Sequence, residues 1–165
     1  MNKIRLTSAQ PRIFLLSWLL ALITLTGCSS KISKIDEADS FGIQFRCLKP
    51  DRLINQVIGN GHCVALLREC SNAPHTSTWR PGLRVMSLKS HQVKTGSIIA
   101  TFLNGKYPNK TGWHAAVYIS HDKQGIWVWD QWRGKAVHKR LIRSHNDKAT
   151  ASNQAEEYRL VEFDV

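Results

Sequence analysis

The chain has few of the features that mark membrane, fibrous or disordered proteins. Its 165 residues include only 10 glycines and 5 prolines, which excludes collagen-like and linker-like sequences. The sequence contains no internal repeat, no low-complexity tract, and no Cys-x-x-Cys pair or histidine spacing that would favour a zinc site. Hydrophobic residues make up 42% of the chain and charged residues 21%, so intrinsic disorder cannot describe the whole of it. The length therefore allows one small globular domain.

Acidic residues are also scarce, with 12 Asp and Glu against 23 Lys and Arg. Residues 1–27 hold three of the basic residues and no acidic one, so the rest of the chain keeps 20 basic against 12 acidic residues, a formal charge of +8. A protein with this charge is concentrated near anionic partners such as a carboxylate-rich cell wall, lipopolysaccharide or nucleic acid.

The amino terminus has the pattern of a targeting segment. Residues 13–25 form a mostly apolar run behind a cationic start, which is too short for a stable membrane span but suits the core of a signal peptide. The run ends in Leu25-Thr26-Gly27-Cys28, which resembles the lipobox of bacterial lipoproteins. In such proteins the chain is cut before the cysteine, and acyl chains on its thiol supply a membrane anchor. A plain secretory signal and a short anchor are the alternatives.

The lipobox interpretation sets the expected domain boundaries. We expect a lipoprotein signal peptide at residues 1–27, a polar tether at 28–45 and the folded domain at 46–165. Ser29 follows the cysteine, which in enteric-type sorting favours the outer membrane. The expected location is the periplasmic face of the cell envelope.

Removing Cys28 leaves Cys47, Cys63 and Cys70, an odd number for an oxidising compartment. Cys63 and Cys70 would lie two helical turns apart, about 10.5 Å by helical rise, which is too far for a disulfide without distortion. We therefore predict a Cys47–Cys70 bridge and a free thiol at Cys63.

Helical patterns come first in the domain and strand patterns follow. Apolar spacing predicts a short helix over residues 51–58, and the uninterrupted segment from Cys63 to Cys70 predicts a second. Strand patterns follow at residues 96–102, 114–119, 125–132, 137–142 and 157–163, with a polar loop at 144–155. This order predicts an α+β domain, with N-terminal helices packed on an antiparallel β-meander and the helix of Cys63 on one face of the sheet.

Cys63 is a candidate nucleophile. It follows Gly61-His62 at the start of an apolar helix, where unpaired N–H groups and the helix dipole favour a thiolate. A cysteine at a helix start is, however, more often a small buried apolar residue. The position of Cys63 alone leaves both interpretations open.

His114, at the start of one strand, and Asp130, near the end of the next, are candidate partners of this thiol. A carboxylate can accept the imidazole N–H and fix its tautomer. Asp130 lies among tryptophans, where an unpaired charge would cost several kcal/mol, so it needs a hydrogen-bonding neighbour. Asp130 and Gln131 point to opposite faces of a regular strand, so only one of them can meet His114, and we prefer Asp130.

The chain order of a helix-start nucleophile, a strand base and an acid on the next strand is that of papain-like cysteine peptidases. The chain resembles one branch of these enzymes, the NlpC-type and CHAP-type bacterial cell-wall amidases. It looks most similar to a small family of bacterial amidase-like proteins, some associated with antibacterial secretion systems. The matching segments cover about residues 50 to 142 and are Gly61-His62-Cys63-Val64-Ala65-Leu66-Leu67, Gly96 to Phe102, Trp113 to Ile119 and Val128 to Trp132.

The resemblance implies a role for each site residue. Cys63 would be the nucleophile, His114 the general base and then acid, and Asp130 the group that orients the imidazole, with Gln131 as the alternative. CHAP-type enzymes usually have Glu and Asn two residues apart here, a pattern that this chain lacks. The backbone N–H of Cys63 and a donor from Asn60 or His62 would bind the oxyanion. No metal or organic cofactor is expected.

The resemblance also implies the substrate, which would be peptidoglycan rather than nucleic acid. The enzyme would cut an amide of the stem peptide or the bond that joins the glycan to L-alanine. A catalytically silent wall-binding lipoprotein and an acyltransferase on the same fold are the alternatives. A cognate immunity protein is a possible partner, and the target could be the cell's own wall or a rival's. The basic stretch of Arg133, Lys135, Lys139, Arg140 and Arg143 is best explained as a solvated hairpin.

Overall fold

The computed structural model describes residues 45–164. The expected signal peptide, the lipobox with Cys28 and all but the last residue of the expected tether lie outside the described residues. Across residues 45–164, no helix is both long and apolar enough to span a bilayer.

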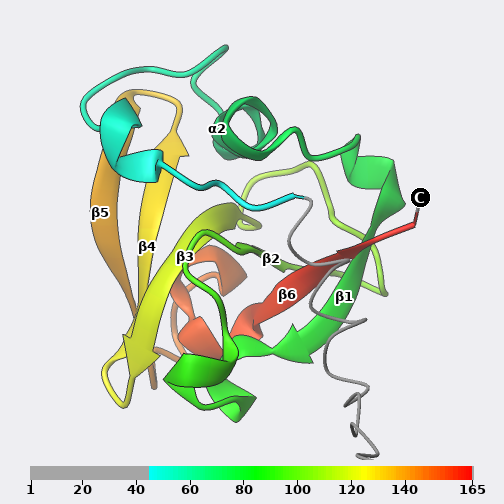
Figure 1. Cartoon of the computed structure of the whole chain (residues 1–165). Coiled ribbons are helices and arrows are strands. Elements are labelled where there is room, and N and C mark those ends of the chain that lie inside the picture. Colours follow the sequence, from blue (N-terminus) through cyan, green and yellow to red (C-terminus); the bar gives the residue numbers. More distant parts are fainter. Residues whose placement is uncertain (1–44, 165) are drawn as a thin grey trace, which may run out of the picture. The chain divides into compact units, whose positions relative to one another are not determined.

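A six-stranded antiparallel sheet forms the centre of the domain, with the strand order β1-β6-β2-β3-β4-β5 (Figure 1). Four consecutive strands, β2 to β5, make the expected meander. The last strand does not extend it but lies between β1 and β2. The strands are β1 (Trp79–Arg84), β2 (Ile98–Thr101), β3 (Ala115–Asp122), β4 (Gly125–Trp132), β5 (Lys135–Arg143) and β6 (Tyr158–Phe163).

Strand β1 is not among the strands that the sequence predicts. It contains Pro81 and Gly82, which interrupt a strand pattern and argue against a central position. In the structure β1 is an edge strand that pairs only with β6, and its register shifts after Pro81. A proline that lacks an N–H group is tolerated at such an edge.

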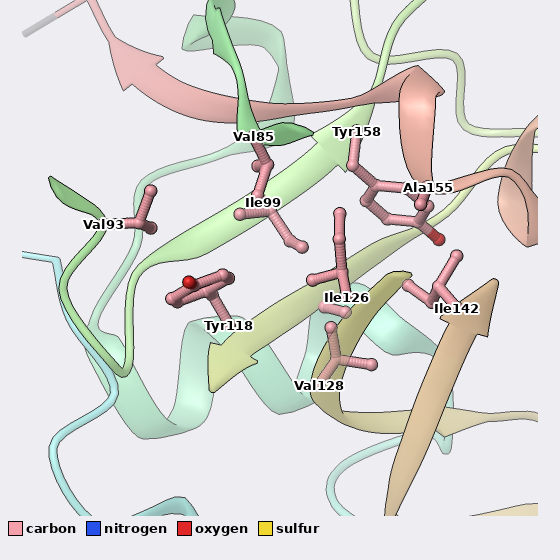
Figure 2. Close-up of a cluster of buried hydrophobic side chains, with 10 residues drawn as sticks. Val85, Val93, Ile99, Tyr118, Ile126, Val128, Ile142, Ala155 and Tyr158 are labelled. Atoms are coloured by element: carbon pink, nitrogen blue, oxygen red, sulfur yellow. The ribbon is translucent and has the colours of Figure 1, made fainter. Parts of the chain in front are cut away.

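Alternating side chains give the sheet two buried faces. On one face, residues such as Ile99, Tyr118 and Val128 pack with Val85 and Ala155 from short 3-10 turns (Figure 2). On the other face, Ile98, Ala100, Ala115 and Val117 pack against Leu67 of the helix α2 (Cys63–Ser71). The sheet is therefore sandwiched between 3-10 turns and one α-helix.

Helix α2 begins at Cys63 as the sequence predicts and ends at Ser71, one residue beyond the predicted end, and it packs on β3 and β4 (Figure 1). Leu66 and Leu67 are buried beneath it, and Asn72 ends it in the left-handed conformation. The packing brings the first residue of the helix, Cys63, close to His114, which immediately precedes β3 and does not begin it as expected, and to β4, which carries Asp130. The α+β class is supported in this coarser form, an antiparallel sheet with few helices.

The helix expected over residues 51–58 is wrong. Only a 3-10 turn forms, η1 (Pro50–Leu53), and the left-handed Asn55 (φ 64°) ends it. The backbone then joins the edge of β5, where Asn55 N–H donates to Val137 O at 2.8 Å and Val137 N–H donates to Gln56 O at 2.9 Å. Pairing with the free edge of β5 thus satisfies backbone groups that a helix would have bonded internally.

Candidate active site

The nucleophile candidate lies at the first position of α2. Gly59 and Gly61 have positive φ angles of 55° and 78°, which fold the preceding loop tightly before the helix begins. His62 is the N-cap residue, and its side chain makes no capping hydrogen bond. Cys63 therefore lies within the first turn, where the helix dipole stabilises a negatively charged sulfur.

His114 and Asp130 are in direct contact. His114 Nε2 lies 2.5 Å from Asp130 Oδ1, and both side chains are buried, with residue exposures of 8% and 0%. Asp130 Oδ1 also accepts a 2.7 Å hydrogen bond from the N–H of Gln131. The carboxylate thus fixes the ring, and Nδ1 of His114 is the nitrogen left for the thiol.

The environment of Cys63 and His114 favours a thiolate paired with an imidazolium. Burial raises the pKa of Cys63, but hydrogen bonds with His114 and Tyr107 and the charge of His114 bring that pKa below its ordinary value of 9.0. Burial lowers the pKa of His114, but hydrogen bonds to Asp130 and Cys63 outweigh it and raise that pKa from 6.5 to about 9. Both shifts favour the thiolate–imidazolium pair, in which the sulfur is the nucleophile.

Arg140 of β5 completes the surroundings of the carboxylate. Its Nε lies 2.6 Å from Asp130 Oδ2, and its side chain is only 19% exposed. The same guanidinium donates to Asn153 Oδ1 at 2.9 Å and to Ser152 O at 3.2 Å. Arg140 therefore compensates the buried negative charge and ties the loop before β6 to the site.

Tyr107 is a neighbour of the thiol that the sequence analysis missed. Its hydroxyl lies 3.5 Å from Cys63 Sγ, and its ring packs on Trp79 with centroids 5.2 Å apart. Burial and the charge of Cys63 raise the pKa of Tyr107, so the hydroxyl keeps its proton. It can donate a hydrogen bond to the sulfur or to a negative oxygen beside it.

Gln131, the alternative residue for orienting the imidazole, contacts the loop before Cys63 instead. Its side chain is fully buried and bonds the loop before Cys63. Oε1 accepts from the N–H of Ile58 at 2.7 Å, and Nε2 donates to the carbonyls of Ile58 and His62, each at 3.0 Å. The structure thus places Asp130 against the imidazole and Gln131 against the nucleophile loop.

The two residues expected to supply an oxyanion donor lie beside the nucleophile. Asn60 Oδ1 accepts a hydrogen bond from the N–H of His62 at 3.1 Å, so that side chain is engaged within its own loop. His62 lines the cavity at Cys63. The Tyr107 hydroxyl lies 3.5 Å from the sulfur of Cys63.

A cavity of about 680 Å³ opens at the thiol. Cys63, Tyr107 and His114 line it, together with Trp132, which is 39% exposed. Trp132 is held by Arg140, which lies 5.4 Å from its ring centroid, and by His138, at 4.7 Å between ring centroids. The thiol therefore lies at a cavity and not in the closed core of the domain.

The other cysteines are used for structure. Cys47 and Cys70 are joined by a disulfide, and Cys63 is the free cysteine within the described residues. The bridge links the segment before η1 to the last turn of α2. It thereby ties the helix that carries the thiol to the start of the domain.

The basic stretch from Arg133 to Arg143 does not behave as one solvated hairpin. Arg140 is mostly buried against Asp130, and Arg133 lines the cavity at Cys63. Lys139 lies 4.8 Å from the ring centroid of Trp127. The solvated interpretation is therefore wrong for Arg140, because its acidic partner lies on the neighbouring strand and is not adjacent in sequence.

A thiol, an imidazole and a carboxylate arranged in this way are the groups of a cysteine-dependent amidase. The family described as Domesticated amidase effector 2 matches residues 37–161, which is most of the chain. The chain belongs to this amidase effector family.

Individual relatives agree with this assignment. A type VI secretion amidase effector 2 protein of Salmonella typhi is 37% identical over 119 residues, covering 64% of this chain and 88% of that protein. Domesticated amidase effector 2 of Ixodes scapularis is 42% identical over 87 residues, covering 51% of this chain and 59% of the relative. The solved structure of type 6 secretion amidase effector 2 has a TM-score of 0.65 at 34% identity, covering 73% of this chain and 96% of that one.

Proposed function

We propose that this amidase hydrolyses amide bonds of peptidoglycan with Cys63 as the nucleophile. The observation that carries the proposal is the chain of contacts from Cys63 through His114 to Asp130. Membership of an amidase effector family supports it, because the names of the relatives state the same reaction class. The basic charge of the chain suits a substrate rich in carboxylates.

Acylation begins from the thiolate–imidazolium pair. The sulfur of Cys63 attacks the carbonyl carbon of the scissile amide, and the carbonyl oxygen takes up the negative charge. When the C–N bond breaks, the imidazolium of His114 gives its proton to the leaving amine. The products of this half-reaction are a free amine and a thioester on Cys63.

Deacylation reverses the role of the imidazole. Neutral His114 accepts a proton from water, whose oxygen attacks the thioester carbon. The C–S bond breaks, the acid product leaves, and the thiolate–imidazolium pair is restored. Asp130 acts through His114 in both halves, because its hydrogen bond holds the ring orientation while the ring gains and loses a proton.

The developing oxyanion needs donors beside the sulfur. The backbone N–H of Cys63 at the start of α2 is one proposed donor, and the Tyr107 hydroxyl is the second. Tyr107 is preferred over Asn60, because Tyr107 lines the cavity at Cys63 and Asn60 does not. His62 lines the same cavity and remains the alternative side-chain donor.

The test uses purified sacculi and the full chain in detergent. Wild-type protein should release free amines, and Cys63→Ala should release none above background. The released amines are counted by labelling with an amine-reactive reagent, since each cut amide bond exposes one amine. Equal release by the two proteins would refute the role of Cys63.

Two bonds remain candidates, an amide within the stem peptide and the bond between the glycan and L-alanine. Both present a carbonyl that the thiolate can attack, so the chemistry at Cys63 does not separate them. Digestion of defined muropeptides followed by mass spectrometry assigns the bond, since each cut gives products of different mass.

We further propose that Cys28 carries a lipid that anchors the mature enzyme in the envelope after removal of residues 1–27. The support is the Leu25-Thr26-Gly27-Cys28 sequence behind an apolar run. Metabolic labelling with a fatty acid should mark the wild-type protein and not Cys28→Ser. Labelling of both proteins would reject this site of acylation.

A further inference from the structure

The cavity at Cys63 is lined by basic side chains and by no acidic one. Lys110, Arg133 and Arg140 are part of its lining, and neither Asp nor Glu contributes to it. Lys110 lies in the loop between β2 and β3, and Arg133 lies in the turn between β4 and β5. Two separate loops therefore bring positive charge to one cavity.

Most of the other charges at the cavity cancel in pairs. The thiolate of Cys63 is balanced by the imidazolium of His114, and Arg140 is balanced by Asp130 at 2.6 Å. Lys110 and Arg133 are the two charged side chains of the lining that these pairs do not neutralise. Both side chains are exposed, and among residues 45–164 neither has an acidic partner. The excess charge of the cavity therefore comes from these two side chains.

We propose that Lys110 and Arg133 form a subsite that binds a free carboxylate of the substrate next to the scissile amide. This inference rests on the proposed function, because peptidoglycan stem peptides carry free carboxylates. An exposed guanidinium can accept a carboxylate through two parallel hydrogen bonds, and an ammonium adds a point charge with three donors. The preferred substrate is thus an acidic peptide, and amidation of its carboxylates weakens binding.

The chain offers matched controls. Lys123 lies in the turn between β3 and β4, and Arg143 lies at the end of β5, so both are at the opposite end of β4 and β5 from Arg133. Both are exposed, and neither lines the cavity. The double variant Lys123→Gln with Arg143→Gln removes the same net charge as Lys110→Gln with Arg133→Gln without touching the subsite.

The experiment measures binding, so that its result does not depend on hydrolysis. The full chain with Cys63→Ala, in detergent, is titrated by calorimetry with a muropeptide that carries free carboxylates and with its amidated form. We expect the acidic form to bind about two- to fivefold more tightly, the range for exposed charge pairs. The Lys110→Gln and Arg133→Gln double variant should lose most of this preference, and the control double variant should retain it. Added salt should reduce the preference.

Two outcomes overturn the subsite. The first is that the acidic and amidated muropeptides bind equally, or that neither binds. The second is that the subsite and control double variants lose the preference for the acidic muropeptide to the same extent. Hydrolysis by the wild type together with equal binding refutes the subsite and leaves the proposed function standing. Selective binding that is lost only in the subsite variant, without hydrolysis by the wild type, supports the subsite and refutes the proposed function.

Discussion

The guanidinium of Arg140 lies 2.6 Å from Asp130 through its Nε, at the carboxylate oxygen that His114 does not contact. Each oxygen of the buried Asp130 thus faces a different basic group. Because the carboxylate has no exposed surface, its charge depends on these partners. Arg140 offsets the buried negative charge of Asp130, and the hydrogen bond and charge of Asp130 in turn raise the pKa of His114.

Arg140→Met should therefore destabilise the fold as well as the site. Removal of the guanidinium leaves a buried carboxylate with one ionic partner, at a cost of about 3 kcal/mol in the free energy of unfolding. Urea titration measures this cost. Arg143→Met, an exposed change on the same strand, should shift stability by less than about 0.5 kcal/mol. Similar losses in both variants would contradict the role of Arg140.

The pH dependence of hydrolysis should follow the two shifted pKa values. Since the pKa of Cys63 is lowered, the thiolate persists below pH 9.0, and activity rises with pH as it forms. Since the pKa of His114 is raised to about 9, the imidazolium is lost above that pH, and activity falls again. The profile of kcat/KM should be bell-shaped, with its alkaline limb near pH 9. Iodoacetamide labelling of Cys63 should persist to lower pH than labelling of an ordinary cysteine thiol, because the pKa of Cys63 is lowered.

Asp130→Asn should move the alkaline limb to lower pH. The hydrogen bond and charge of Asp130 raise the pKa of His114, so their loss lowers that pKa and shortens the range in which the imidazolium exists. The measurement is the pH profile of the variant against the wild type. An unchanged alkaline limb would show that Asp130 does not set the protonation of His114.

Tyr107→Phe should reduce kcat/KM by about 10²-fold, because it removes one donor to the oxyanion. It should also raise the pKa of Cys63, since the tyrosine hydrogen bond lowers it. Steady-state kinetics and pH-dependent labelling measure the two effects. Tyr118→Phe is the matched hydroxyl deletion, because Tyr118 bonds Ser90 and His121 outside the cavity. A loss of equal size in Tyr118→Phe would argue against a direct role for Tyr107.

Local sequence patterns predicted the parts of the fold that depend on local chemistry. Helix α2 is bounded by Gly61 and Asn72, whose left-handed conformations stop regular structure at both ends. Strands β3 and β4 are mostly apolar segments joined by a short polar turn, which is a local hairpin signal. β1 was missed because Pro81 and Gly82 weaken its strand pattern, and an edge strand needs fewer backbone donors.

The site was only partly accessible to sequence reasoning, because some contacts depend on strand register. Arg140 pairs across the ladder with Val128, two residues from Asp130, so the two side chains meet on a diagonal. Nothing in the run of basic residues on β5 reveals that diagonal. Tyr107 lies in a polar loop without regular periodicity, so no pattern placed it near Cys63.

Loss of the Cys47–Cys70 disulfide should destabilise the domain without removing the reactive thiol. The bridge closes a sequence separation of 23 residues, for which chain entropy predicts about 3 kcal/mol. The double variant Cys47→Ser with Cys70→Ser should therefore unfold at lower urea concentration. Its Cys63 should still react with iodoacetamide under native conditions, since the contacts of Cys63 with His114 and Tyr107 do not involve the bridge. Unchanged stability would contradict the structural role of the bridge.

Gln131→Met should separate the positioning of the nucleophile from the chemistry of the imidazole. Methionine fills a similar volume but makes none of the three hydrogen bonds to Ile58 and His62. The backbone groups left buried should cost about 2–3 kcal/mol of stability. Because the loop that carries Cys63 is then loosely held, kcat should fall more than KM rises, and the alkaline limb set by His114 should stay near pH 9. A shift of that limb equal to the shift in Asp130→Asn would instead place Gln131 in contact with the imidazole.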